Sequence, residues 1–380
     1  MKQNSPTVSS SPWSALRKEW AVLLGIATAL LFLLFGKGWL SDLSNQLQNG
    51  LLFVWLFVTI LLSAFAVVRH ADCLAIKLGE PYGTLILTIS VIGMEVMMVS
   101  AVMLTGGSDP TLARDTMYSV IMILLNGLFG FALVLGGWRH GEQHYNLQGA
   151  VSYLAMLVPL TALALILPAH LEPVSPGMQT FRAWTLALTS IGLYGIFLVV
   201  QTKRHPDFFV EPAAPIPTDE AAEAQEHGDL EIRSIPYHAV LLLLCLLPVI
   251  VLSKKLAVLL DYGVDRFGAP VALSGVLVAT LILAPEGLTA VRAALGNRLQ
   301  RSVNLLYGAA ATTIALTVPA VIFISLRTGM PLTLGLSPAN QVLLVTTLLL
   351  SVVTCTTGRT NVLNGFIHLL MFVAYLVLIF

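Results

Sequence analysis

Two glutamates, Glu95 and Glu286, lie well inside long apolar runs of the sequence. The remaining Asp and Glu residues are expected in loops, in tails or at the ends of helices. A charged side chain in the middle of a bilayer is costly, so an acid in such a run usually faces a cavity or a partner. Because no Lys or Arg lies deep in these runs, the two acids indicate a site for protons or cations.

Further oxygen ligands are expected near both acids. Thr84 and Thr88 share the helix face of Glu95. Pro285 has no N–H, so the carbonyl of Leu281 loses its helical donor, and we expect a broken helix with a free carbonyl beside Glu286. The following spans add hydroxyl and amide groups, which either ligate the ion or only pack helices together: Ser119, Asn126, Asn304, Thr312 and Thr313. Asn364 and His368 are interpreted as packing groups.

The composition predicts a membrane protein. The chain has 380 residues, of which 57% are hydrophobic and 11% charged, and its mean hydropathy is +0.85. Soluble domains carry roughly 25% charged residues, so soluble and disordered proteins are excluded. The net charge is zero and predicts no nucleic-acid partner. Cys73, Cys245 and Cys355 show no spacing that is typical of zinc sites or disulfide scaffolds.

Charge-poor runs predict an all-α polytopic protein of about eleven transmembrane helices, since about 20 apolar residues cross a bilayer. The first run follows a polar segment and has no cleavage site, so we expect it to be retained. The predicted spans are 20–40, 50–68, 83–104, 117–137, 150–168, 181–201, 238–256, 270–291, 303–325, 338–356 and 361–380.

The loop charges predict an orientation. Most Lys and Arg residues fall on the side of the N-terminus, which indicates a cytoplasmic N-terminus and an external C-terminus. The linker 202–237 then lies in the cytoplasm. It is rich in Pro, Asp and Glu and is interpreted as a solvated connection, or alternatively as a weak cation-gathering segment without EF-hand spacing.

The sequence divides into two similar halves around this linker. Residues 1–49 form a tail and an extra helix, whereas 50–201 and 238–380 each hold five predicted helices. The acidic helix 83–104 follows Pro81, and the acidic helix 270–291 begins at Pro270. Because five is odd, the halves have opposite orientations in the membrane. Inverted repeats with a central site are typical of secondary transporters.

Several stretches resemble a known family. His70-Ala71-Asp72 with Leu78 to Leu87, Leu283 to Leu288 around Pro285-Glu286, and Thr357 to Gly365 are similar to bacterial calcium/proton antiporters of the ChaA type, within the cation/calcium exchanger superfamily. The resemblance implies that Glu95 and Glu286 are the transport carboxylates. In this chain Ile92 and Leu283 stand where the superfamily has asparagine ligands, and Gly308-Ala309-Ala310 replaces a Gly-Ser-Ser element.

The residues and the resemblance together predict an antiporter of the bacterial inner membrane that exchanges cytoplasmic Ca²⁺ for external H⁺ at a shared two-glutamate site. The alternative is mainly Na⁺ or K⁺ exchange for H⁺, and a channel is the less favoured alternative. No HExxH, GxSxG or phosphate-binding glycine loop predicts an enzyme. The expected partners are the lipid bilayer and the transported ions, no cofactor is expected, and the oligomeric state stays open.

Overall fold

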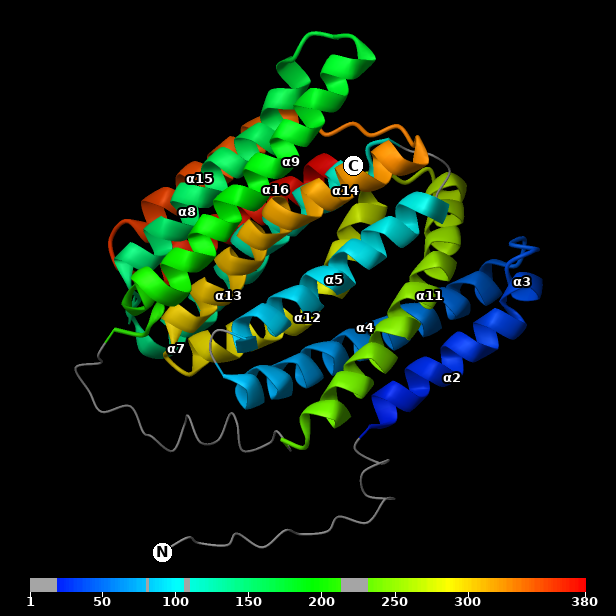
Figure 1. Cartoon of the computed structure of the whole chain (residues 1–380), viewed down its shortest axis with the longest axis horizontal. Coiled ribbons are helices and arrows are strands. Elements are labelled where there is room, and N and C mark those ends of the chain that lie inside the picture. Colours follow the sequence, from blue (N-terminus) through cyan, green and yellow to red (C-terminus); the bar gives the residue numbers. More distant parts are fainter. Residues whose placement is uncertain (1–18, 80–81, 106–109, 213–231) are drawn as a thin grey trace, which may run out of the picture.

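The computed structural model describes residues 19–79, 82–105, 110–212 and 232–380. Within these ranges the chain is a bundle of helices with one two-residue β-ladder (Figure 1). The expected N-terminal tail and most of the acidic linker lie outside the described residues.

The part before the linker is a series of helices, three of which contain a π-helical turn. In chain order they are α2 (Trp20–Leu34), α3 (Gly36–Trp39), α4 (Gln46–Leu78), α5 (Tyr82–Thr105), α6 (Leu112–Met122), η1 (π, Ile123–Leu128), α7 (Phe129–His140), α8 (Leu147–Thr161), η2 (π, Ala162–Ile166), η3 (3₁₀, Leu167–His170), α9 (Pro176–Val199), η4 (π, Val200–Arg204) and η5 (3₁₀, Pro206–Phe209).

The part after the linker repeats the pattern of long helices. It consists of α11 (Ile235–Phe267), α12 (Ala272–Leu295), α13 (Leu299–Thr312), η6 (π, Thr313–Thr317), α14 (Val318–Thr328), α15 (Pro338–Cys355) and α16 (Val362–Ile379). Strands β1 (Gln143–His144) and β2 (Arg359–Thr360) pair antiparallel and join the two parts at one end of the bundle.

The structure confirms an all-α polytopic membrane protein. Among the described residues, nine helical segments are long and apolar enough to span a membrane. The shorter apolar helices Trp20–Leu34 and Ile89–Ala101 lie within the two remaining predicted spans, 20–40 and 83–104. Large apolar side chains such as Leu188 and Leu370 are exposed, as expected of a surface that faces lipid rather than water.

Helices α5 and α12 carry the two predicted acids, and α5 packs against α4 and α11. On one side, α4 packs along α11, and α2 contacts both of them (Figure 1). On the other side, α12 packs against α6, α7 and α13, and α16 packs against α7. Each acidic helix therefore contacts helices of the other part of the chain: α5 contacts α11, and α12 contacts α6 and α7.

The long helix α4 contains an acid that was expected in a loop or at a helix end. Asp72 lies within α4, which has 33 residues and is far longer than the predicted span. At about 1.5 Å per residue this helix is roughly 50 Å long, more than the ~30 Å of a hydrocarbon core. Hydropathy detects only the membrane-embedded part, so the polar end was missed. Asp115 lies in the first turn of α6 and is buried.

Candidate cation and proton site

Glu95 is held by two hydroxyl groups from the other half of the chain. Its side chain on α5 is 3% exposed. Thr313 Oγ1 donates to Glu95 Oε2 at 2.9 Å, and Thr317 Oγ1 donates to Glu95 Oε1 at 3.0 Å. Both threonines belong to the π-helical turn η6, a wide turn of a kind that is frequent at functional sites. The carboxylate of Glu95 is thus oriented by contacts between the two halves.

Glu286 on α12 has a different environment. Its Oε2 atom is buried and has no hydrogen-bond partner. The carboxyl group interacts electrostatically with Glu95 and with Asp72 of α4. A buried oxygen without a donor is costly, so it is suited to receive a proton or a cation. The structure therefore brings together the two predicted glutamates and adds Asp72, which the sequence analysis did not select.

The expected break in the acidic helix of the second half is wrong. Helix α12 continues through Pro285 from Ala272 to Leu295. Surrounding helices bury Pro285 and Leu281, and such packing lets a membrane helix tolerate proline. Gly287 has a steric role instead, because a Cβ atom there would lie 2.7 Å from the Leu128 side chain of η1. Leu281 stays a candidate carbonyl ligand inside an unbroken helix.

Of the hydroxyl and amide groups predicted near the acids, Thr313 is placed at Glu95. The neighbouring Thr312 donates to the carbonyl of its own helix at Gly308. Asn304 lies at the linker end of α13, where it donates to the carbonyl of Phe209 at 2.7 Å. The side chains of Thr84 and Thr88 lie outside the described part of the structure.

Asn126 belongs to a separate buried network. It is fully buried in η1, and its Nδ2 donates to Thr347 Oγ1 of α15 at 2.8 Å. Its Oδ1 lies 3.2 Å from His368 Nδ1, and His368 Nε2 lies 3.1 Å from Thr354 Oγ1. His368 thus packs as expected, and it also links α16 by hydrogen bonds to η1 and α15.

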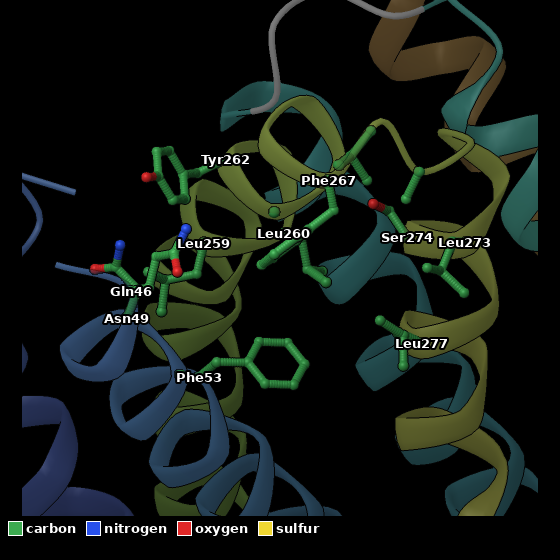
Figure 2. Close-up of a pocket in the computed structure, with 14 residues that line it drawn as sticks. Gln46, Asn49, Phe53, Leu259, Leu260, Tyr262, Phe267, Leu273, Ser274 and Leu277 are labelled. Atoms are coloured by element: carbon green, nitrogen blue, oxygen red, sulfur yellow. The ribbon is translucent and has the colours of Figure 1, made fainter. Parts of the chain in front are cut away.

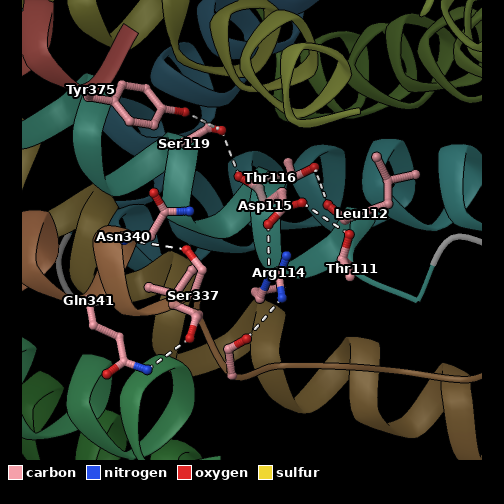
Figure 3. Close-up of polar contacts among 12 residues, drawn as sticks. Thr111, Leu112, Arg114, Asp115, Thr116, Ser119, Ser337, Asn340, Gln341 and Tyr375 are labelled. Atoms are coloured by element: carbon pink, nitrogen blue, oxygen red, sulfur yellow. Dashed lines mark hydrogen bonds and ion pairs between the residues drawn. The ribbon is translucent and has the colours of Figure 1, made fainter. Parts of the chain in front are cut away.

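Ser119 is part of a cluster that anchors α6 (Figure 3). It accepts a hydrogen bond from Tyr375 at 2.7 Å and donates to the carbonyl of Asp115 at 2.6 Å. The Asp115 carboxylate pairs with Arg114 at 2.8 Å, and Arg114 also donates to the carbonyl of Gly335 at 2.9 Å. Because this acid has a partner and a structural contact, it is not comparable to Glu286.

Thr317 was missed by sequence reasoning. It follows Thr313 by four residues, so the two hydroxyls share one side of the helical turn, and that spacing was a signal in the sequence. The spacing does not identify the hydrogen-bond partner, because Glu95 lies in the other half of the chain.

A cavity lies away from the glutamates (Figure 2). It has a volume of about 340 Å³ and lies between α4, α11 and α12, with mainly apolar residues such as Phe53, Leu260 and Phe267 around it. Neither Glu95 nor Glu286 lines it. In the described residues, no three His, Cys, Asp or Glu side chains form a metal-binding group. A cation at the glutamates would therefore need hydroxyl, carbonyl or water oxygens besides the two carboxylates.

The fold and the site define a polytopic membrane protein with two buried carboxylates contributed by separate halves of the chain. Comparison with known proteins identifies its family. Residues 48–203 and 237–380 match the family described as sodium/calcium exchanger protein, and the chain belongs to this family. It is a family of transporters rather than of enzymes, and the predicted resemblance to ChaA-type antiporters is confirmed.

Two curated relatives differ in their named ions. The chain is 46% identical to the sodium-potassium/proton antiporter ChaA of Escherichia coli over 323 residues, which is 85% of this chain and 87% of the relative. It is 25% identical to a Ca(2+)/H(+) antiporter of Aphanothece halophytica over 266 residues, 67% of this chain and 70% of the relative.

Two solved structures share the fold. Native YfkE matches with a TM-score of 0.72 at 17% identity, over 95% of this chain and 98% of that protein. The H⁺/Ca²⁺ exchanger CAX matches with a TM-score of 0.63 at 14% identity, over 95% of this chain and 88% of that protein.

Proposed function

We propose that this protein is a cation/proton antiporter of the bacterial inner membrane, in which protons and cations compete for Glu95 and Glu286. The observation that carries the proposal is that two acids from different halves interact electrostatically and that one of them has a buried oxygen without a partner. A proton and a cation each neutralise the same carboxylates, so loading of one species opposes loading of the other. Relatives named as cation/proton antiporters support the proposal.

Alternating access requires two elements that move around the site. We propose that 50–201 and 238–380 are inverted repeats joined by the linker 202–237, with 1–49 as an N-terminal addition. In each half the second helix carries the acid and the third contains a π-helical turn, η1 or η6. Such repeats can expose a shared site first to one side and then to the other. The N-terminus is proposed to lie in the cytoplasm and the C-terminus outside.

Ca²⁺ is the cation that the two carboxylates fit best. It prefers oxygen ligands and carries a double charge, which two ionised glutamates would balance. Threonine hydroxyls and the carbonyl of Leu281 are the proposed additional ligands, completed by water. External protons would then enter as Ca²⁺ leaves the cytoplasm.

Exchange of Na⁺ or K⁺ for protons is the second candidate. It is favoured by the relative at 46% identity, whose name specifies sodium and potassium. The apolar side chains of Ile92 and Leu283 near the acids also supply no amide oxygen to a demanding divalent ion.

Everted membrane vesicles test the proposal. Respiration acidifies the lumen, a quenched dye reports the pH, and Ca²⁺, Na⁺ or K⁺ is added separately. Glu95→Gln and Glu286→Gln are compared with wild type, and with Glu142→Gln as a control because this exposed acid pairs only with Arg359 at the surface. Dequenching by Ca²⁺ that both site variants lose supports Ca²⁺/H⁺ exchange.

The other outcomes are equally decisive. Dequenching by Na⁺ or K⁺ alone assigns the monovalent exchange. Wild-type dequenching in either site variant, at equal abundance in the membrane, would overturn the two-glutamate site for every cation.

A further inference from the structure

Two histidines contact each other at the linker end of α4 and α11. His70 of α4 and His238 of α11 are 1% and 3% exposed, and their Nδ1 atoms lie 3.0 Å apart. Their polar partners are Glu19 just before α2, Arg69 of α4 and Arg233 just before α11, and do not include the two site glutamates. The pair therefore forms a cluster of its own, where the linker enters the second half.

The partners of the two rings determine where the hydrogens lie. The backbone N–H of Arg233 donates to His238 Nε2 at 2.9 Å, so this nitrogen is an acceptor. In a neutral ring the hydrogen is then on Nδ1, which donates to Nδ1 of His70. The hydrogen of His70 must then lie on Nε2, which is 3.3 Å from both Glu19 Oε2 and Arg69 Nη2; of these two, only the carboxylate oxygen can accept it. The neutral pair is thus one directed chain from Arg233 to Glu19.

Glu19 completes this chain as its anionic end. It also accepts hydrogen bonds from Arg69 and, at 2.9 Å, from the hydroxyl of Tyr237. Burial raises the pKa of Glu19, but the hydrogen bonds from His70 and Tyr237 and the Arg69 charge outweigh burial and lower it to about 2. Glu19 therefore stays ionised wherever an imidazole titrates.

An additional proton cannot enter the cluster without breaking a contact. Both acceptor nitrogens already face an N–H group, so protonation of either ring places two donors against each other. A charged His70 keeps its contact with Glu19, and His238 must then place its hydrogen on Nε2, opposite the Arg233 N–H. The contact that is lost lies where the linker joins α11.

The surrounding charges do not offer another acceptor to that N–H. Lys77 donates to the carbonyl of Arg233 at 2.7 Å, and the Arg233 guanidinium lies 5.0 Å from the centre of the Tyr237 ring. Both groups are cationic, and Glu19 is the anion of the cluster. Protonation is therefore favoured by Glu19 and is opposed by Arg69, Lys77 and Arg233.

We propose that His70 and His238 form a second proton-binding site, separate from the transport glutamates, whose protonation breaks the contact between the Arg233 N–H and His238 at the start of α11 and slows exchange when the linker side becomes acidic. Imidazoles change charge close to neutral pH. Because this contact lies where the linker enters α11, and α11 packs along α4, its loss changes the end of the helix that joins the two halves. The effect on exchange rests on the proposed antiport, whereas the proton site itself does not.

Histidine ¹⁵N spectra of the intact protein in detergent test the proton site directly. At about pH 8 we expect a neutral His238 with hydrogen on Nδ1 and a neutral His70 with hydrogen on Nε2, and both signals should change together as the pH falls below about 6. His70→Gln and His238→Gln assign the signals and should each shift the titration of the remaining ring. Opposite tautomers, or titration of each ring that is unaffected by replacing the other, would overturn the proposal.

Everted vesicles test the consequence for exchange, because their medium contacts the linker side. At saturating cation, protons no longer compete for the glutamates. The pH dependence of the maximal exchange rate then reflects protonation of the two histidines. We expect the wild-type maximal rate to fall by up to about tenfold per pH unit below neutrality, as one coupled proton allows. His70→Gln, His238→Gln and the double variant should show the same flatter profile.

His140→Gln is the matched control, since this exposed histidine contacts the carbonyl of Leu295 at 2.8 Å. It should keep the wild-type profile. Equal profiles of wild type and both cluster variants would refute control of exchange by this pair. If the protein exchanges no cation, the antiport proposal fails, and the spectra still decide whether the proton site exists.

Discussion

The two glutamates of the site occupy contrasting environments. Glu95 has a hydroxyl donor on each oxygen, from Thr313 and Thr317, whereas Glu286 retains a buried oxygen without a donor. Glu95 is already oriented by threonines of the other half, whereas Glu286 needs a bound proton or cation to satisfy its buried oxygen. The two acidic helices thus carry one pre-organised carboxylate and one that is energetically unfavourable without a bound proton or cation.

The π-helical turns explain this contrast. In the second half, η6 presents two hydroxyls to Glu95. In the first half, the amide of Asn126 in η1 is bound by Thr347 and lies beside His368. The polar group of η1 is therefore committed to α15 and α16, and η1 meets α12 through Leu128 at Gly287.

The largest effect is expected from replacing each acid with methionine. Exchange should fall at least about 100-fold in both variants, because each removes a charge that the cation needs. Stability should separate them. Glu286→Met removes an unsatisfied oxygen and should leave stability unchanged or raise it by about 1–3 kcal/mol, whereas Glu95→Met breaks two hydrogen bonds and should lower it. Thermal unfolding in detergent measures the stability of both variants. Equal shifts in the unfolding temperature would contradict the difference between the two environments.

The threonines of η6 should have the next largest effect. Thr313→Val and Thr317→Val each remove one donor to Glu95, and a hydrogen bond to a charged group contributes about 1.5–3 kcal/mol, or roughly 10–100-fold. We expect the cation concentration needed for half-maximal exchange to rise by this factor. Thr312→Val is the matched control, since its hydroxyl bonds only within its own helix, and it should change little. Equal effects at all three positions would show general destabilisation.

The close approach of α12 to η1 gives a smaller prediction. Gly287→Ala would place a methyl group 2.7 Å from the Leu128 side chain. Overpacking of this kind costs about 1–3 kcal/mol and should separate the helices near Glu286. Exchange should slow, and Leu128→Ala in the same chain should restore much of the rate. A rate that stays low in the double variant would argue against a steric cause.

The smallest effect is expected at Glu211, an acid outside the spans. The backbone N–H of Gln300 at the start of α13 donates to its Oε1 at 3.4 Å. Burial raises the pKa of Glu211 from 4.5 to about 7, although the N–H groups of Gln300 and Arg301 and the Arg298 charge oppose the shift. The folded state thus binds the proton more tightly than the unfolded state.

This sign defines the pH test. The stabilising contribution of protonated Glu211 is complete below its ordinary pKa and is lost as the pH rises through about 7. Relative to Glu211→Gln, wild type should become less thermally stable between about pH 5 and 8, by about 2 °C given the partial exposure. An unchanged difference between the two proteins across this range would contradict the shift.

Much of the architecture follows from local properties of the sequence. Every predicted span corresponds to an apolar helix, because burial in hydrocarbon selects for uninterrupted apolar runs. The ends of α4 and α11 were missed because helices can continue beyond the membrane, where polar residues are tolerated. The prediction of a break at Pro285 is wrong, because neighbouring helices bury Pro285 and α12 stays continuous.

The sequence by itself determined that this is a polytopic membrane protein and that Glu95 and Glu286 are its unusual residues, since an ionisable group in an apolar run is costly wherever the run is placed. Only the tertiary structure decided their partners. The interactions of Thr317 with Glu95, of Asp72 with Glu286 and of His70 with His238 join helices that are distant in sequence. The sequence does not show which of these helices pack together. The pairing of polar groups arises when the halves pack, because buried hydrogen-bonding groups must then find partners among their new neighbours.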